Sequence, residues 1–189
     1  MAAVTSRRTA LDGVLVIEPK VFGDSRGFFF EAWHLERYRD LGVPGTFVQD
    51  NVSRSVRGTL RGLHVQEPYA QGKLVQVLDG EVFDVAVDVR VGSPTFGRWV
   101  GERLSSENHR QMYVPPGFAH GFCVLSESAL FSYKCTELYH PETEICIAWD
   151  DATVGIAWPI TAERLLSPKD ATARLLDDIP KQQLPRWRG

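Results

Sequence analysis

The chain has 189 residues, of which 43% are hydrophobic and 24% are charged, and its formal net charge at pH 7 is −3. This size and composition fit one globular domain with a full core, while the slightly acidic balance argues against a nucleic-acid partner. No apolar run approaches the roughly 20 residues needed to span a bilayer, and the N-terminus lacks the apolar segment of a signal peptide, so we expect a cytoplasmic protein without a membrane partner.

Short β-rich runs alternate with turn residues from about residue 11 to residue 158. Arg7 and Arg8 precede this body and are expected in a frayed N-terminus. Many short strands at such spacing are typical of an antiparallel sandwich or barrel, the jelly roll included. The predicted strands are 14–18, 28–32, 47–52, 59–66, 73–78, 80–90, 99–104, 111–114, 121–125, 130–136 and 146–149.

The run "GEVFDVAVDVR" (80–90) shows the strand alternation most clearly. One face carries Phe83, Val85, Val87 and Val89, and the other carries Val82, Asp84, Ala86 and Asp88. Because the second face holds two carboxylates, we expect it to meet water or a polar cavity.

Helices are predicted in two places. The first is "HLERYRDL" (34–41). After Trp158 the sequence pattern again predicts helix, over 161–166 and 167–179. Ser167 followed by Pro168 and Asp170 is a favourable helix start. We therefore expect one domain over 1–189, with a β body of about 11–158 and a helical tail of about 159–189.

The cysteines Cys123, Cys135 and Cys146 are odd in number, lack paired spacing and stand in apolar contexts. Buried free thiols in a reducing compartment are the interpretation that this pattern favours.

His64 lies in the predicted strand "TLRGLHVQ" (59–66) among other polar groups. A strand histidine is more often structural than catalytic, but so many polar groups in one strand pair would be costly to bury without a ligand. Strict alternation puts His64 and Arg61 on opposite faces. We therefore predict a bulge at Gly62 that lets both reach one site.

Metal binding is the rival interpretation of His64. A small β-barrel metal site commonly uses His-x-His with a carboxylate, whereas Gln66 occupies the second position here. His120 is the only plausible distant partner, so we expect no metal. No nucleophile elbow, phosphate-binding glycine loop, dinucleotide fingerprint or zinc cysteine pair is present either, and no cofactor is expected.

Each of three further residues allows both a structural and a functional interpretation. His120, after the turn "PPG", is either a turn histidine or a site residue. Tyr133 is either a packing residue or a general acid. Arg26, in "DSRG", is either a solvated turn residue or an anion ligand.

Several motifs of this sequence, taken together, resemble those of a known protein family. They are "VFGDSRGFFFE" (21–31), "FVQDNVSRS" (47–55), "LRGLHVQ" (60–66), "QGKLV" (71–75), "GEVFDVAVDVRVGSPTFGRW" (80–99), "VPPGFAHGF" (114–122), "YKCTELY" (133–139) and "WDD" (149–151). In this order they resemble the dTDP-4-dehydrorhamnose 3,5-epimerase family over about 14–170. The resemblance implies a cupin-type jelly roll, a homodimer with exchanged edge strands, and epimerisation of a dTDP-4-keto-6-deoxy sugar at C3 and C5.

The resemblance also implies roles for individual residues. His64 matches the base, Asp170 the carboxylate that supports it, Tyr133 the proton donor, and Lys73 the residue beside the developing oxyanion. Further positions match substrate contacts: Arg26, Glu31, Gln49, Asn51, Arg61, His120, Glu144 and Lys169.

Three residues depart from the family pattern. Val65 replaces a frequent aromatic residue, and Ile145 and Cys146 stand where Arg-Gly is common. These departures leave open an epimerase that inverts C3 alone, in an antibiotic deoxysugar pathway. Two more distant hypotheses are a non-catalytic cupin that binds a nucleotide sugar and a metal-dependent dioxygenase of the cupin type.

Overall fold

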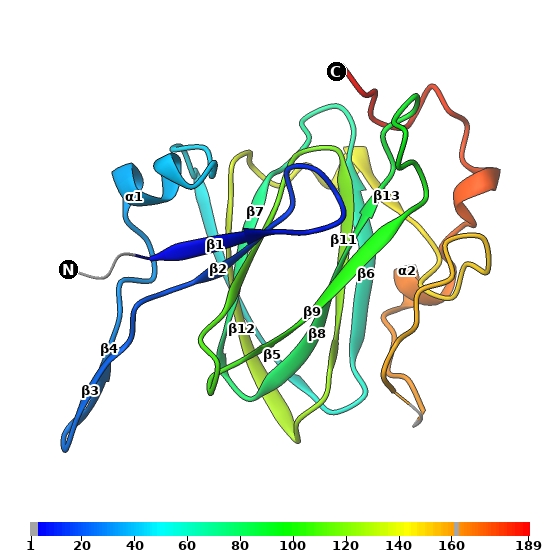
Figure 1. Cartoon of the computed structure of the whole chain (residues 1–189). Coiled ribbons are helices and arrows are strands. Elements are labelled where there is room, and N and C mark those ends of the chain that lie inside the picture. Colours follow the sequence, from blue (N-terminus) through cyan, green and yellow to red (C-terminus); the bar gives the residue numbers. More distant parts are fainter. Residues whose placement is uncertain (1–3, 161–162) are drawn as a thin grey trace.

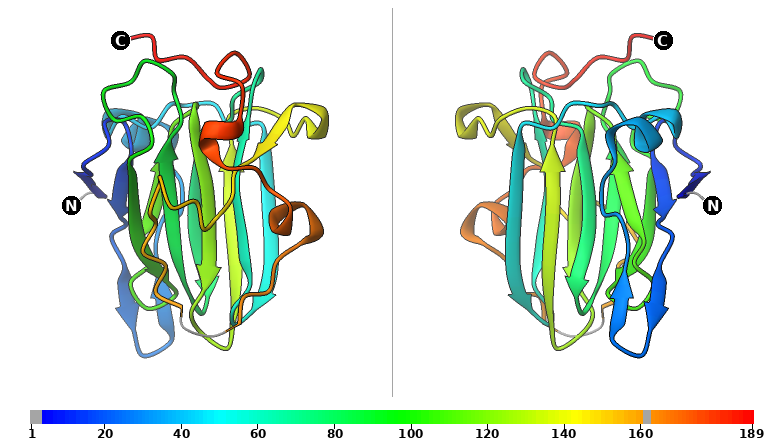
Figure 2. Two further views of the ribbon diagram at one scale, coloured as in Figure 1. Left: turned by 90° about the vertical axis from the view of Figure 1, so that its right-hand side faces the viewer. Right: turned by 90° about the vertical axis from the view of Figure 1, so that its left-hand side faces the viewer.

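Two antiparallel sheets face each other in the computed structural model, which describes residues 4–160 and 163–189 (Figure 1). The six-stranded sheet contains, in spatial order, β1 (Thr5–Arg8), β2 (Leu15–Glu18), β10 (Gln111–Val114), β7 (Lys73–Asp79), β12 (Ser128–Cys135) and β5 (Gln49–Val56). The five-stranded sheet contains β13 (Glu144–Cys146), β6 (Leu60–Gln66), β11 (Phe118–Val124), β8 (Glu81–Asp88) and β9 (Trp99–Ser105). The predicted antiparallel jelly roll is confirmed, and Figure 2 shows its strands from two opposite sides.

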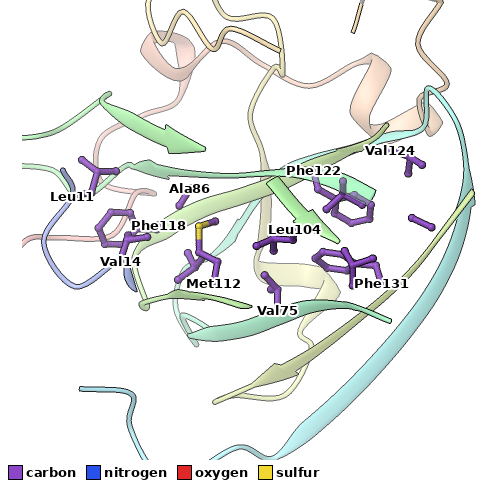
Figure 3. Packing of buried hydrophobic residues seen from close by; sticks show 14 residues of the cluster. Leu11, Val14, Val75, Ala86, Leu104, Met112, Phe118, Phe122, Val124 and Phe131 are labelled. Atoms are coloured by element: carbon purple, nitrogen blue, oxygen red, sulfur yellow. The ribbon is translucent and has the colours of Figure 1, made fainter. Parts of the chain in front are cut away.

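The main hydrophobic core fills the space between the two sheets (Figure 3). Met112 and Phe131 reach it from the six-stranded sheet, and Phe118 and Phe122 reach it from β11. The rings of Phe122 and Phe131 stack with centroids 4.1 Å apart. This packing holds the sheets at a fixed separation and leaves room for polar residues further along the same interior.

A second core lies on the other side of the five-stranded sheet. Val85 and Val87 of β8 pack there against Leu176, Ile179 and Leu184 from the C-terminal segment. Because both faces of this sheet are covered, every residue of β11 is buried.

The carboxylates of β8 therefore have no route to bulk water. Asp84 and Asp88 are both fully buried. Val82 and Ala86, which share this face with Asp84, belong to the main core, so the face meets the core and not water or a polar cavity as expected. Asp84 is paired there with His120. Asp88 is held instead by hydrogen bonds from Arg90, Ser93 and Thr95.

Arg7 and Arg8 lie in a paired strand, so the expectation that they belong to a frayed segment is wrong. Arg7 and Arg8 belong to β1, which pairs with β2 in antiparallel register. The Arg7 guanidinium also forms an ion pair with Glu102 of β9. A free edge of β2 supplies the backbone partners that a terminal segment needs in order to become a strand.

Several element boundaries differ from the predictions. The early helix is confirmed as α1 (Leu35–Asp40). The predicted strand 28–32 is instead a separate hairpin, β3 (Phe22–Asp24) and β4 (Gly27–Phe29), and the predicted strand 146–149 overlaps β13 only at Cys146. Within the described residues no helix is long and apolar enough to cross a membrane.

The C-terminal segment contains only short helices. They are α2 (Pro168–Ala171) and the 3₁₀ turn η2 (Leu176–Asp178), which follow another 3₁₀ turn, η1 (Pro141–Thr143). The predicted helix 161–166 is absent over residues 163–166, and residues 161–162 lie outside the described part. The backbone of Leu165 instead bonds to Gly58 and Leu60, so tertiary pairing replaces the local helix.

Asp151 fastens the C-terminal segment to the β body. Its buried carboxylate accepts hydrogen bonds from the backbone N–H groups of Thr153 and Leu176. Burial opposes ionisation, but these bonds overcome it and lower the pKa of Asp151 below its usual 3.8.

We expect Asp151→Ala to lower the free energy of unfolding by about 2–4 kcal/mol, because the buried N–H groups of Val154 and Leu176 lose their acceptor. Since the folded pKa is depressed, the contribution of Asp151 is complete above its usual pKa and disappears as the pH falls through the folded value. Urea melts at pH 7 and pH 3 measure both effects, and an unchanged midpoint for Asp151→Ala at pH 7 would contradict this role.

Candidate active site

A cavity of about 280 Å³ opens between the sheets beside α2. Its walls come from β5, β7 and β12 of one sheet and from β6, β11 and β13 of the other. Polar groups line much of it: Gln49, Asn51, Ser53, Arg61, His64, Gln71, Lys73, His120, Tyr133, Tyr139, Glu144, Ser167, Lys169 and Asp170. All the residues proposed for the site lie here except Arg26 and Glu31.

The bulge predicted in β6 is present and brings Arg61 and His64 to the same cavity. His120 pairs with His64 and Phe122 pairs with Arg61, so β6 has one more residue than β11 over this interval. Gly62 lies inside the bulge with a φ of 107°, and a Cβ there would meet Gly121 Cα at 2.6 Å. Both the dihedral angle and the close approach require glycine.

His64 and Asp170 form a hydrogen-bonded pair, with 2.6 Å between Nε2 and Oδ1. The first turn of α2 sets the position of Asp170, because Ser167 Oγ caps its backbone N–H and also donates to its Oδ2 at 2.7 Å. Burial opposes ionisation of Asp170, but the bonds from His64 and Ser167 lower its pKa below the usual value. The carboxylate therefore stays ionised and fixes the imidazole, and Nδ1 is left for a reacting group.

Tyr133 and Lys73 approach from the six-stranded sheet, so they face His64 across the cavity. Burial raises the pKa of Tyr133, which keeps its hydroxyl protonated. Burial lowers the pKa of Lys73, although the neighbouring Cys135, Glu144 and Asp84 oppose that change. A lysine of this kind gives up its proton more readily than a solvated one.

His120 belongs to β11 and not to the turn before it. Its Nε2 lies 2.8 Å from Oδ1 of Asp84, and the other oxygen of this buried carboxylate has no partner among the described residues. Burial raises the pKa of Asp84, opposed by His120. Asp84 is not among the residues predicted for the site, although the alternation in β8 places it on the inward face.

The outer part of the cavity carries positive charge and amide groups. Arg61 Nε and Nη2 contact Ser55 Oγ at 3.2 and 3.1 Å, and Gln49 Nε2 donates to Asn51 Oδ1 at 3.0 Å. Lys169 Nζ binds Glu144 at 2.6 Å. Guanidinium and ammonium groups next to amides are suited to a phosphorylated ligand.

Arg26 and Glu31 are outside this cavity. Arg26 sits at the tip of the β3–β4 hairpin with its side chain 87% exposed, paired to Asp24. Glu31 forms an ion pair with Arg37 of α1. The chain by itself does not bring either residue to the other predicted site residues.

Gln66 has no free atom for a metal. Its Nε2 donates to the carbonyls of Tyr69 and Leu138, and its Oε1 accepts from the backbone of His140. Over the described ranges, one group has metal-ligand spacing, consisting of His64, Cys146 and Asp170.

The residues that depart from the family pattern fall into two classes. Val65 and Ile145 pair across β6 and β13 and belong to the second core, so neither lines the main cavity. Val65 lines a small pocket beside it. Cys146 instead lies opposite His64. The cysteines Cys123, Cys135 and Cys146 are all free, as predicted, but only Cys123 and Cys135 are buried and Cys146 is half-buried. Burial raises the pKa of Cys146 to about 11, so it is a protonated thiol at neutral pH.

Comparison with known proteins identifies the family. The family model described as dTDP-4-dehydrorhamnose 3,5-epimerase matches residues 8–178. The dTDP-4-dehydrorhamnose 3,5-epimerase of Pseudomonas aeruginosa is 58% identical over 90% of this chain and 95% of its own length. The dTDP-4-dehydrorhamnose 3-epimerase of Streptomyces niveus is 42% identical over 90% of this chain and 83% of its own length.

A solved structure agrees with this assignment. The crystal structure of dTDP-6-deoxy-D-glucose-3,5-epimerase from Legionella pneumophila in complex with dTDP-4-keto-L-rhamnose has a TM-score of 0.96 and 55% identity. The match covers 98% of this chain and 100% of that one. The chain therefore belongs to the dTDP-4-dehydrorhamnose 3,5-epimerase family.

Proposed function

We propose that this protein converts dTDP-4-dehydro-6-deoxy-D-glucose into dTDP-4-dehydro-L-rhamnose by inverting C3 and C5, a step of dTDP-L-rhamnose biosynthesis. The observation that carries the proposal is the His64–Asp170 pair, 2.6 Å long, on the wall of a cavity whose opposite wall holds Tyr133. A base and an acid on opposite walls are what inversion of a carbon next to a ketone requires.

The first step is removal of a proton from a carbon next to the C4 ketone. Nδ1 of His64 takes the proton, the C–H electrons form a carbon–carbon double bond, and the carbonyl electrons move onto O4. The ionised Asp170 stabilises the imidazolium that results. Lys73 lies beside the developing oxyanion, where a fixed donor is worth most.

The second step returns a proton to the opposite face of the same carbon. Tyr133 donates from its hydroxyl, O4 reforms the ketone, and the tyrosinate recovers a proton from solvent while His64 releases one. The two steps occur once at C3 and once at C5. They involve no net oxidation, and the mechanism uses no cofactor.

Further residues hold the dTDP group and the sugar in this scheme. Arg61 and Lys169 pair with the diphosphate, and Gln49 and Asn51 bind the substrate through their side-chain amides. His120 contacts the sugar, and Asp84 fixes the His120 imidazole ring. Glu144 holds Lys169 in place. Oriented binding of this kind lets the energy of the nucleotide contacts support the chemistry at the sugar.

Inversion at two centres is favoured over inversion at C3 alone. The chain is 58% identical to a 3,5-epimerase and 42% identical to a 3-epimerase over the same share of its length. Val65 and Ile145, two of the departures that left the question open, lie outside the cavity. Analysis of the reaction product distinguishes the candidate functions. We expect the L-sugar, whereas a product that keeps the D configuration at C5 would support the C3-only enzyme. Unchanged substrate would support a binding protein.

We also propose a homodimer in which the β3–β4 hairpin reaches the cavity of a second copy. The hairpin extends away from the sheets (Figure 1) and exposes Phe22, Phe28 and Phe29 by 51%, 63% and 65%. Edge strand β5 exposes Val52 and Val56. Apolar side chains on a hairpin and on an open sheet edge fit a partner of the same kind.

Arg26→Ala is expected to raise KM about tenfold or more with a small change in kcat, because Arg26 would bind the diphosphate in the partner's cavity. Arg103→Ala, at another exposed arginine paired with Glu81, is the matched control. Light scattering checks the dimer itself. A monomer with full activity, or an unchanged KM for Arg26→Ala, would contradict this arrangement.

The proposed location is the cytoplasm. Three free cysteines are typical of a reducing compartment.

A further inference from the structure

Cys146 stands beside the proposed base without taking part in the proposed reaction. It lies directly opposite His64 in the antiparallel pair of β13 and β6. Side chains at such positions have Cβ atoms about 5 Å apart on the same face of a sheet. The register of the two strands therefore places the Cys146 thiol next to the His64 imidazole.

Asp170 completes a cluster of three possible ligands. A ring nitrogen of His64, Sγ of Cys146 and a carboxylate oxygen of Asp170 all lie within 4.8 Å of one another. Three separate elements, β6, β13 and α2, supply them. Glu144 Oε1 lies 3.7 Å from His64 Nδ1 but does not belong to this cluster.

We propose that these residues form an inhibitory site for zinc and similar thiophilic divalent cations, with His64, Cys146 and Asp170 as ligands. Imidazole, thiolate and carboxylate are the three ligand types of protein zinc sites. A thiolate also selects against magnesium and calcium, which bind to oxygen.

Coordination requires a small local change. Nε2 of His64 and Oδ1 of Asp170 are 2.6 Å apart because a proton lies between them, whereas two ligand atoms at about 2.0 Å from a tetrahedral zinc are about 3.3 Å apart. The carboxylate moves back by that difference and the cation takes the place of the proton on Nε2. The thiol proton, and any ring proton that the cation replaces, pass to solvent.

Coordination at Nε2 removes the base, so the inhibition that we infer rests on the proposed function of His64. A neutral imidazole whose Nε2 binds the cation carries its proton on Nδ1 and cannot accept another. Zinc binding itself depends only on the cluster.

Cobalt is the probe for binding, because cobalt–thiolate bonds absorb in the near ultraviolet. The reduced, chelator-treated protein is expected to show this absorption on titration with Co²⁺ and to lose it when Zn²⁺ is added. Cys146→Ala and Cys146→Ser should both lack it, while Cys123→Ala, at a buried thiol outside the cavity, should keep it. No absorption in the wild type, or the same absorption in both Cys146 variants, overturns the proposal.

Inhibition is measured separately on the same proteins. Loss of one ligand should raise the Zn²⁺ concentration for half-inhibition by at least about 100-fold in Cys146→Ala, each variant being referred to its own metal-free rate. Mg²⁺ should not inhibit. Cobalt absorption in a protein without epimerase activity would contradict the proposed function alone, and an active enzyme without the absorption would contradict the metal site alone. Equal zinc sensitivity of wild type and Cys146→Ala also contradicts the metal site.

Discussion

His64→Asn is expected to abolish measurable epimerisation, with kcat reduced by about 10³-fold or more. The asparagine amide can occupy the position of the ring and can bond to Asp170, but it cannot accept a proton from carbon. Positioned acid–base groups contribute about 10²–10⁴-fold to such reactions. The fold should survive, because the His64 side chain is 18% exposed and serves no core cluster.

The measurement is the initial rate of product formation together with a thermal melt. His34→Asn is the matched control, because His34 caps α1 outside the cavity and asparagine is also a good cap. A variant at position 64 that still exchanged substrate protons with deuterated water at a substantial rate would show that another group is the base.

Tyr133→Phe is expected to separate proton removal from inversion. His64 can still take the proton and return it to the face from which it came, so solvent deuterium should enter the substrate without a change of configuration. Inversion should slow by about 10²–10⁴-fold, since the acid on the opposite wall is missing. The substitution removes one oxygen and leaves the ring, so packing against Phe131 should persist.

Proton NMR of the recovered substrate distinguishes these outcomes. Tyr113→Phe, at a buried tyrosine outside the cavity, controls for the loss of a hydroxyl. If Tyr133→Phe inverts C3 and C5 at the wild-type rate, Tyr133 is not the proton donor.

The alternation of residues along single strands predicted one feature of the site correctly. The conflict between strand alternation and the shared role of Arg61 and His64 predicted the bulge at Gly62, because the two-residue period of a strand leaves few other solutions. The alternation in β8 placed Asp84 and Asp88 on one face, but it did not predict that both carboxylates would be fully buried. It could not show that His120 would meet Asp84, since that pairing depends on how β8 and β11 align.

Contacts between residues far apart in the sequence could not be predicted from local sequence patterns. His64 and Asp170 are 106 residues apart, and only the family resemblance connected them. The predicted helix over 161–166 failed at residues 163–166 because backbone groups at Gly58 and Leu60 offered Leu165 better partners. Arg26 and Glu31 were expected with the other site residues, and one copy of the chain leaves them outside the cavity. In the proposed homodimer Arg26 would serve a second copy, which the contacts of one copy cannot show.

We expect this chain to invert C3 and C5 of a dTDP-4-keto-6-deoxy sugar through His64 and Tyr133. Proton NMR of the wild-type reaction in deuterated water, starting from dTDP-4-dehydro-6-deoxy-D-glucose, tests it most directly. We predict deuterium at both C3 and C5 of an L-configured product. Deuterium at C3 alone, or no deuterium at either carbon, would contradict the claim.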